Sequence, residues 1–117
     1  MAFSAYVVVS NKTSSEIKDV QVLLDNNNDQ VQLLDFGGVP KNKTSTIRHG
    51  IFVHPSNSDK WTITFKNASG EILQVDRVDF GVKRGDSGRN IEINFLGSNK
   101  IEFKRQGKTK TETASKP

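Results

Sequence analysis

The segment LLDNNNDQVQLL (23–34) places carboxylates where they could bind a metal ion. Asp25 and Asp29 are separated by asparagines, which is how the first half of a calcium-binding loop is built. An EF-hand that began at Asp25 would need Gly at its sixth position and Glu at its twelfth, but the chain has Gln30 and Phe36 there. Asn and Asp also favour tight turns, because they tolerate a left-handed backbone and hydrogen-bond to their own main chain. We therefore predict a hairpin loop here and no metal site.

Other polar segments could bring more charged side chains to the same place. If successive strands run mostly up and down, the loops 25–30, 54–59 and 83–89 lie at one end of the molecule, and 11–15, 37–43, 67–70 and 97–99 lie at the other. Side chains in the first group are our candidate binding residues: Asp25, Asp29, His54, Asp59, Arg84, Asp86 and Arg89. The carboxylates among them could hold calcium as in C2-like domains, but the neighbouring cations favour a solvated polar rim.

The segment KRGDSGR (83–89) contains two short matches to known motifs. Arg84-Gly85-Asp86-Ser87 is the RGDS of integrin ligands and resembles the cell-binding loop of a fibronectin type III module; a glycine-rich hairpin loop with solvated charges is the simpler interpretation. GDSG (85–88) matches the nucleophile segment of trypsin-like proteases, but those continue with Gly-Pro where this chain has Arg89-Asn90. We predict no catalytic residues and no enzymatic activity, because no nucleophile and base stand in a recognisable arrangement.

The two histidines are the remaining candidates for acid–base or ligand chemistry. His49 and His54 have no third ligand at a clear spacing, and cysteine is absent from the chain. We therefore expect surface or turn histidines and no cofactor.

Strict alternation of apolar and polar residues predicts the elements that position these loops. KWTITFK (60–66) and NIEINF (90–95) each turn apolar side chains to one side, and KIEFK (100–104) repeats the pattern. In NIEINF, Glu92 and Asn94 are predicted to face water. Further strands are predicted at 3–10, 16–24, 31–36, 44–53 and 71–82, the last with a change of phase between Val75 and Val78 that a bulge or a change of sheet would require.

Turn-forming segments separate these strands, and no stretch carries a helical period. We therefore predict an all-β fold: an antiparallel β-sandwich, immunoglobulin-like or C2-like, of seven to nine short strands over residues 2–104.

The formal net charge of +4 is concentrated in one segment. Residues 104–117 hold five Lys/Arg and one Glu, so the rest of the chain sums to zero. Because Ala114 is the only apolar residue in that segment, we predict a flexible basic tail over 105–117. The first residues lack the charged start of a signal peptide, so we expect a cytoplasmic protein, with non-classical secretion left open.

One stretch resembles a known family. Residues 5–22 (AYVVVSNKTSSEIKDVQV) resemble the opening of the aegerolysins, small cysteine-poor β-sandwich proteins that bind membrane lipids. The rest of that family is rich in tryptophan and acidic, whereas this chain has one tryptophan and a positive net charge.

From these patterns we predict a non-enzymatic binding module that presents its ligand loops at one end of a β-sandwich. Two alternatives stay open: a lipid- or carbohydrate-binding lectin or toxin-like protein, and an assembly subunit that pairs through an edge strand. We expect a protein partner or small ligand at the loop end and no nucleic acid, and we leave a membrane surface and an oligomer open.

Overall fold

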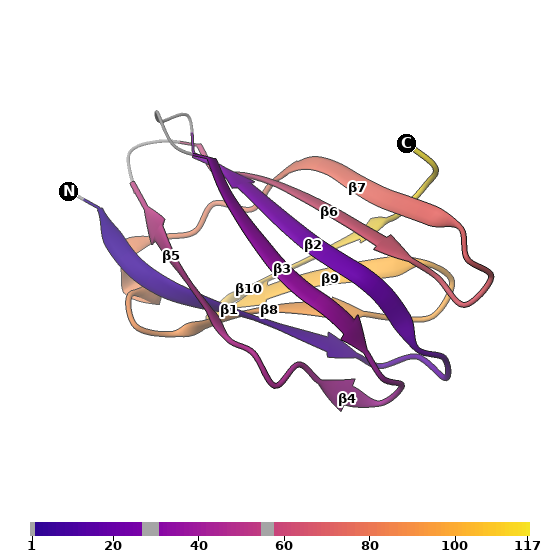
Figure 1. Cartoon of the computed structure of the whole chain (residues 1–117). Helices are drawn as coiled ribbons and strands as arrows, with labels where there is room; N and C mark the ends of the chain where they lie inside the picture. The colour runs from indigo at the N-terminus through magenta and orange to yellow at the C-terminus, as the bar shows by residue number, and fades with distance from the viewer. Residues whose placement is uncertain (1, 27–30, 55–57) are drawn as a thin grey trace.

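A computed structural model describes residues 2–26, 31–54 and 58–117 and shows a β-sandwich (Figure 1). The elements, in chain order, are β1 (Phe3–Asn11), β2 (Ile17–Asp25), β3 (Val31–Val39), β4 (Lys43–Thr44), β5 (His49–Val53), β6 (Lys60–Lys66), β7 (Ile72–Asp79), η1 (Arg84–Asp86), β8 (Asn90–Phe95), β9 (Lys100–Arg105) and β10 (Lys108–Thr113). The predicted fold class is confirmed, with ten strands in the described residues in place of seven to nine.

The strands form two sheets. The four-stranded sheet has the order β3-β2-β6-β7, and the six-stranded sheet has the order β10-β9-β8-β1-β4 with β5 also paired to β1. Neighbouring strands are antiparallel except for β1 and β8, which run parallel with Val9 opposite Ile93. Because the chain passes repeatedly from one sheet to the other, loops from both sheets meet at each end of the sandwich (Figure 1).

The predicted alternation places the core between the sheets. Trp61, Ile63 and Phe65 of β6 are buried, and so are Ile91 and Ile93 of β8. Burial of each such side chain contributes about 1.5–3 kcal/mol relative to exposure, which makes the apolar face the main reason that these strands pack. The side chains that alternate with them on β6, including Thr62, are partly exposed, as predicted.

The change of phase in β7 is a bulge. Ile63 pairs with Val75, and the next pair toward the other end is Trp61 with Val78, so β7 holds one extra residue. Arg77 has φ 49°, a left-handed conformation that absorbs this residue. Val75 and Val78 both face the core as a result.

Asn94 does not face water, and that part of the prediction for β8 is wrong. Its exposed fraction is 0%, and its Nδ2 donates to Glu102 Oε1 at 2.9 Å. The reason is its central position: Asn94 lies opposite Ser10 of β1 and Glu102 of β9, so a strand flanks it on each side.

The prediction of a flexible tail is also wrong. Strand β10 pairs with β9 along its length, from Lys108 opposite Arg105 to Thr113 opposite Lys100. Ala114 is buried, and Ser115 forms a two-way backbone pair with Gln74 of β7. A strand can dock without an apolar face, because the edge of β9 offers unpaired backbone groups.

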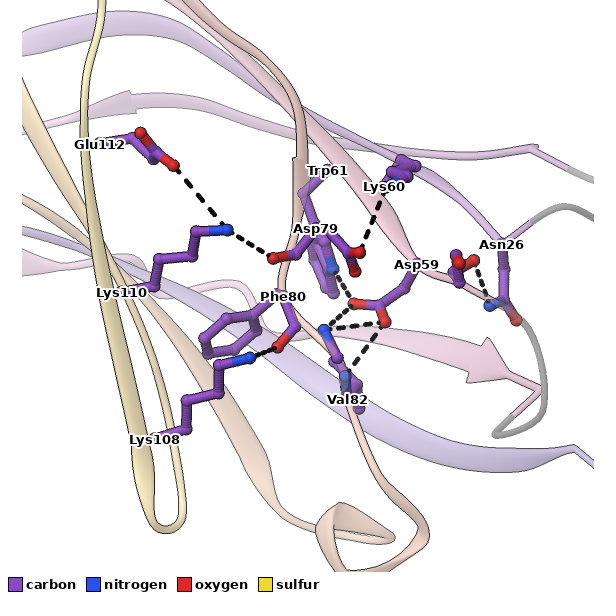
Figure 2. Close-up of polar contacts among 12 residues, drawn as sticks. Asn26, Asp59, Lys60, Trp61, Asp79, Phe80, Val82, Lys108, Lys110 and Glu112 are labelled. Carbon is purple, nitrogen blue, oxygen red and sulfur yellow. Dashed lines mark hydrogen bonds and ion pairs between the residues drawn. The ribbon is translucent and has the colours of Figure 1, made fainter.

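Side chains tie the two sheets together along both of their edges. Between β3 and β5, Gln32 donates its Nε2 to Phe52 O and accepts from Phe52 N, both at 2.8 Å. Between β7 and β10, Lys108 Nζ donates to Phe80 O at 2.6 Å and Lys110 Nζ donates to Asp79 O at 2.8 Å (Figure 2). These contacts occupy backbone groups that an incoming strand would otherwise pair with.

Candidate functional site

The structure brings the predicted loops together at one end, on the left in Figure 1. Asn26, at the end of β2, donates to Ser58 O at 3.0 Å and accepts from the backbone N–H of His54. Asp59 in turn bonds to the segment after β7. The predicted gathering of the loops around 25–30, 54–59 and 83–89 is therefore confirmed for their described residues.

Asp59, however, is part of the core of this end. Its exposed fraction is 1%, and its carboxylate accepts hydrogen bonds from Trp61 Nε1 (2.6 Å), Gly81 N (3.0 Å) and Val82 N (3.1 Å), as Figure 2 shows. Burial raises the pKa of Asp59 above its ordinary value, while the hydrogen bonds from Trp61 and Val82 oppose that rise. Its oxygens hold the chain crossover from β7 and face no solvent.

Asp86 is likewise buried, and its carboxylate also accepts a hydrogen bond from the main chain. It is 3% exposed, and its Oδ2 accepts from Lys83 N at 2.8 Å, which closes the single turn of η1. Arg105 Nε lies 3.8 Å from the same oxygen. The tripeptide Arg84-Gly85-Asp86 is thus a structural turn whose carboxylate is turned inward, whereas a receptor would need that carboxylate at the surface.

The other predicted residues at this end lie nearer the surface. Asp25 pairs with Arg77 at 3.1 Å across the outer face of the four-stranded sheet. His54 is half-buried, and Arg84 and Arg89 are exposed, with the Arg84 guanidinium 5.8 Å from the ring centre of Phe3. Asp29 lies outside the described residues.

No shared site emerges from these side chains. Among the described residues, no group of three His, Asp or Glu side chains could hold a metal ion. His49, the second histidine, lies away from this cluster, with its Nε2 2.8 Å from Asp35 O and its ring edge-on to Phe36. Nothing in the described part of the chain is a helix long and apolar enough to cross a membrane.

A cavity of about 250 Å³ lies at the opposite end, among loops that are on the right in Figure 1. Three loops surround it: β1–β2, β6–β7 and β8–β9. The lining residues are Thr13, Ser14, Ser15, Glu16, Ile17, Phe65, Asn67, Ala68, Ser69, Phe95, Leu96, Gly97, Ser98 and Asn99. Phe65 and Phe95, in edge-on contact with ring centres 4.8 Å apart, join the two sheets beneath it. The cavity therefore has an apolar floor and a rim of hydroxyl and amide groups.

A buried asparagine shapes the first loop of the rim. Asn11 is 0% exposed, and its Nδ2 donates to Ser15 O (2.8 Å) and Val39 O (2.9 Å). Its Oδ1 accepts from both the backbone and the hydroxyl of Thr13. Lys12 N donates to Phe95 O, which ties this loop to β8. Satisfied buried polar groups of this kind rigidify the segment that they hold.

A second asparagine shapes the next loop. Asn67 Oδ1 accepts from Ser69 N (3.1 Å) and Glu71 N (3.0 Å), and its Nδ2 donates to Glu71 Oε1 at 3.2 Å. That hydrogen bond from Asn67, together with Lys116, lowers the pKa of the exposed Glu71 carboxyl. The third loop turns through Ser98 and Asn99, both with positive φ, in a hairpin closed by Leu96 N donating to Lys100 O. All three loops of the rim are fixed by internal hydrogen bonds.

Four hydroxyls of the rim remain available to a ligand. The exposed serines of the rim are Ser14, Ser15, Ser69 and Ser98, and among the described residues none hydrogen-bonds to their side chains. Each hydroxyl can donate one hydrogen bond and accept two. A rigid rim with free hydroxyls around a hollow is preorganised for a polar ligand, since little ordering remains to oppose binding.

Comparisons with known proteins give no family for this chain: no family model matches it, and no curated protein matches its sequence.

Sequence patterns predicted this group of loops but not the cavity. The segments 11–15, 37–43, 67–70 and 97–99 are predicted together at one end; residues of 11–15, 67–70 and 97–99 line the cavity, and none of 37–43 does. Their composition is that of ordinary turns, so nothing in it separates a rim residue such as Ser98 from a simple turn residue. The only distinguishing signal is the number of Ser, Thr and Asn residues in the three loops.

Proposed function

We propose that this protein is a non-enzymatic binding module of the lectin type, which holds a carbohydrate in the cavity formed by the β1–β2, β6–β7 and β8–β9 loops. The observation that carries the proposal is the free hydroxyls of Ser14, Ser15, Ser69 and Ser98 on a rigid rim above an apolar floor. Binding sites are concave, with a few well-placed polar groups over apolar surface.

The chemistry of the rim suits a polyhydroxylated ligand. A sugar hydroxyl both donates and accepts hydrogen bonds, and the rim offers serine hydroxyls and asparagine amides that do the same. The C–H groups on the face of a sugar ring can lie against the side chains of Ile17 and Leu96. The volume of about 250 Å³ lies just below the range of pockets for drug-sized ligands, which suits one sugar ring at the end of a longer chain.

Two features favour this function over the alternatives. The carboxylates of Asp59 and Asp86, at the other end, already accept hydrogen bonds from backbone N–H groups and are not free to bind a ligand. Pairing through β5 or β7 is disfavoured, because Gln32 already bonds to the backbone of Phe52 and Lys110 to that of Asp79.

A glycan array followed by binding titration tests the proposal. The double variant Ser14→Ala/Ser98→Ala removes two rim hydroxyls, and Thr109→Ala/Thr111→Ala removes two exposed hydroxyls from β10 as a matched control. We expect the rim variant to bind its best glycan about tenfold more weakly, since two hydrogen bonds of roughly 0.7 kcal/mol each amount to that factor. The control should bind like the wild type.

Binding of no glycan, or equal binding by the rim variant and the wild type, would overturn the proposal. Ala68→Trp gives a second readout, because a large side chain at the mouth of the cavity should block ligands without removing any hydrogen bond of the fold.

A further inference from the structure

Lysines gather around the end of the molecule that carries the cavity. Lys12 and Lys100 each adjoin a residue of the cavity lining, and Lys12 and Lys43 both line a second hollow of about 200 Å³ beside β4. Lys41 lies between, in the β3–β4 connection. We call Lys12, Lys41, Lys43 and Lys100 the end lysines.

The end lysines are exposed, and among the described residues none of their side chains forms an ion pair or hydrogen bond. Some other lysines of the fold are paired: Lys60 pairs with Asp79 at 3.3 Å, and Lys66 lies 3.7 Å from Asp19. Glu71, at the cavity end, is already paired with Lys116 at 3.3 Å. Glu16 is the one carboxylate among the described cavity-lining residues, so the end carries an excess of positive charge.

We infer that the ligand of this end is an acidic carbohydrate, with carboxylate or sulfate groups. The inference rests on the proposed carbohydrate function and adds the class of sugar. One ring of the chain occupies the cavity, and its neighbours extend along the hollow between Lys12 and Lys43 with their anionic groups facing the ammonium groups. Unpaired cations around a concave surface raise the local concentration of an anionic ligand and speed its association.

The surface suits an acidic sugar better than a nucleic acid. Single-stranded nucleic acids stack their bases on exposed aromatic rings. At this end the aromatic rings of Phe65 and Phe95 are 3% and 2% exposed, so a base cannot stack on them. Phe52, the exposed phenylalanine, pairs with Ser4 near the start of β1, toward the other end.

The test compares one polymer with and without its charge. Binding of dextran and dextran sulfate is measured by titration at two salt concentrations, with alginate as the carboxylated probe. The end triple is Lys12→Gln, Lys43→Gln and Lys100→Gln. The control triple is Lys83→Gln, Arg89→Gln and Lys104→Gln, which removes the same charge from exposed positions of the described structure outside the cavity end.

We expect the wild type to prefer a charged polymer to dextran, and the end triple to lose about tenfold in affinity for it, since exposed ion pairs contribute modestly and add up. The control triple should lose much less, and raising the salt should shrink the difference by screening. The glycan that binds in the cavity should still bind the end triple if it is neutral.

Other outcomes overturn the inference in distinguishable ways. An equal loss of affinity in the end triple and the control triple would mean that the net charge of the protein alone attracts the polymer. Preference for neutral glycans would refute the acidic ligand while leaving the carbohydrate function intact, and absence of all glycan binding would refute both. Stronger binding to single-stranded DNA or to vesicles of acidic phospholipid, lost in the end triple, would assign this end to that partner instead.

Discussion

Replacing Asp59 tests whether its buried carboxylate organises the end of the molecule that the sequence predicted to bind ligands. Asp59→Ala leaves three donors without their acceptor: Trp61 Nε1, Gly81 N and Val82 N. An unsatisfied buried donor costs about 1–3 kcal/mol. Gly81 is half-exposed and can reach water, so we expect the loss to total about 3–5 kcal/mol of unfolding free energy.

Asp59→Asn is the more discriminating substitution. It keeps one oxygen for the backbone of Gly81 and Val82 but turns an amide N–H₂ toward the indole N–H of Trp61. Loss of that single charge-assisted bond should cost about 1.5–3 kcal/mol. Asp76→Asn is the control: Asp76 is exposed, with its Oδ1 at 3.4 Å from Thr62 Oγ1, and the change should stay within about 0.5 kcal/mol.

The pH dependence gives an independent readout. Because burial raises the pKa of Asp59 in the folded protein, the folded state holds its proton longer than the unfolded state, whose value is near 3.8. Between about pH 3.8 and the raised pKa, the folded state therefore binds more protons than the unfolded state. The contribution of Asp59 to the unfolding free energy falls as the pH rises through that window. The advantage of the wild type over Asp59→Asn should accordingly widen as the pH is lowered.

Urea denaturation of the three variants and the wild type, at pH 7 and at stepwise lower pH, measures both effects. Wild-type stability in Asp59→Asn, or a gap between the two proteins that does not change with pH, would show that the buried carboxylate does not organise this end. Asp59 would then return as a candidate ligand residue.

Three further predictions concern the sheets. Removing residues 105–117 should lower the unfolding free energy by several kcal/mol, since it deletes β10 and uncovers the edge of β9. In the intact chain, trypsin should cleave after Lys108 and Lys110 only slowly. Rapid removal of the segment that leaves a stable remainder would contradict the presence of β10. Ile93→Ala should cost about 2–5 kcal/mol in urea denaturation, as for a fully buried side chain. Asn94→Ala should cost about 1–3 kcal/mol, because it leaves Glu102 without its donor; a neutral effect would mean that Asn94 faces water after all.

The local pattern of the sequence was sufficient for the framework of this protein. Alternation along 60–66 and 90–95 predicted which apolar side chains face the core, and the change of phase between Val75 and Val78 predicted a bulge or a change of sheet, of which the structure has the bulge. These features depend only on the two-residue period of a strand and on burial of apolar surface, so they can be read from neighbouring residues. The loops that meet at each end followed from the same framework.

The tertiary structure decided the individual contacts between residues far apart in the chain. Asp59 and Asp86 are acidic residues in polar loops, which favours exposure, but each also has a partner about twenty positions away, Val82 for Asp59 and Arg105 for Asp86, that no local pattern indicates. Residues 108–113 lack an apolar face and form a strand only because β9 presents an open edge. The cavity likewise exists only where three loops from both sheets meet, because a hollow is a relation between segments and no single segment encodes it.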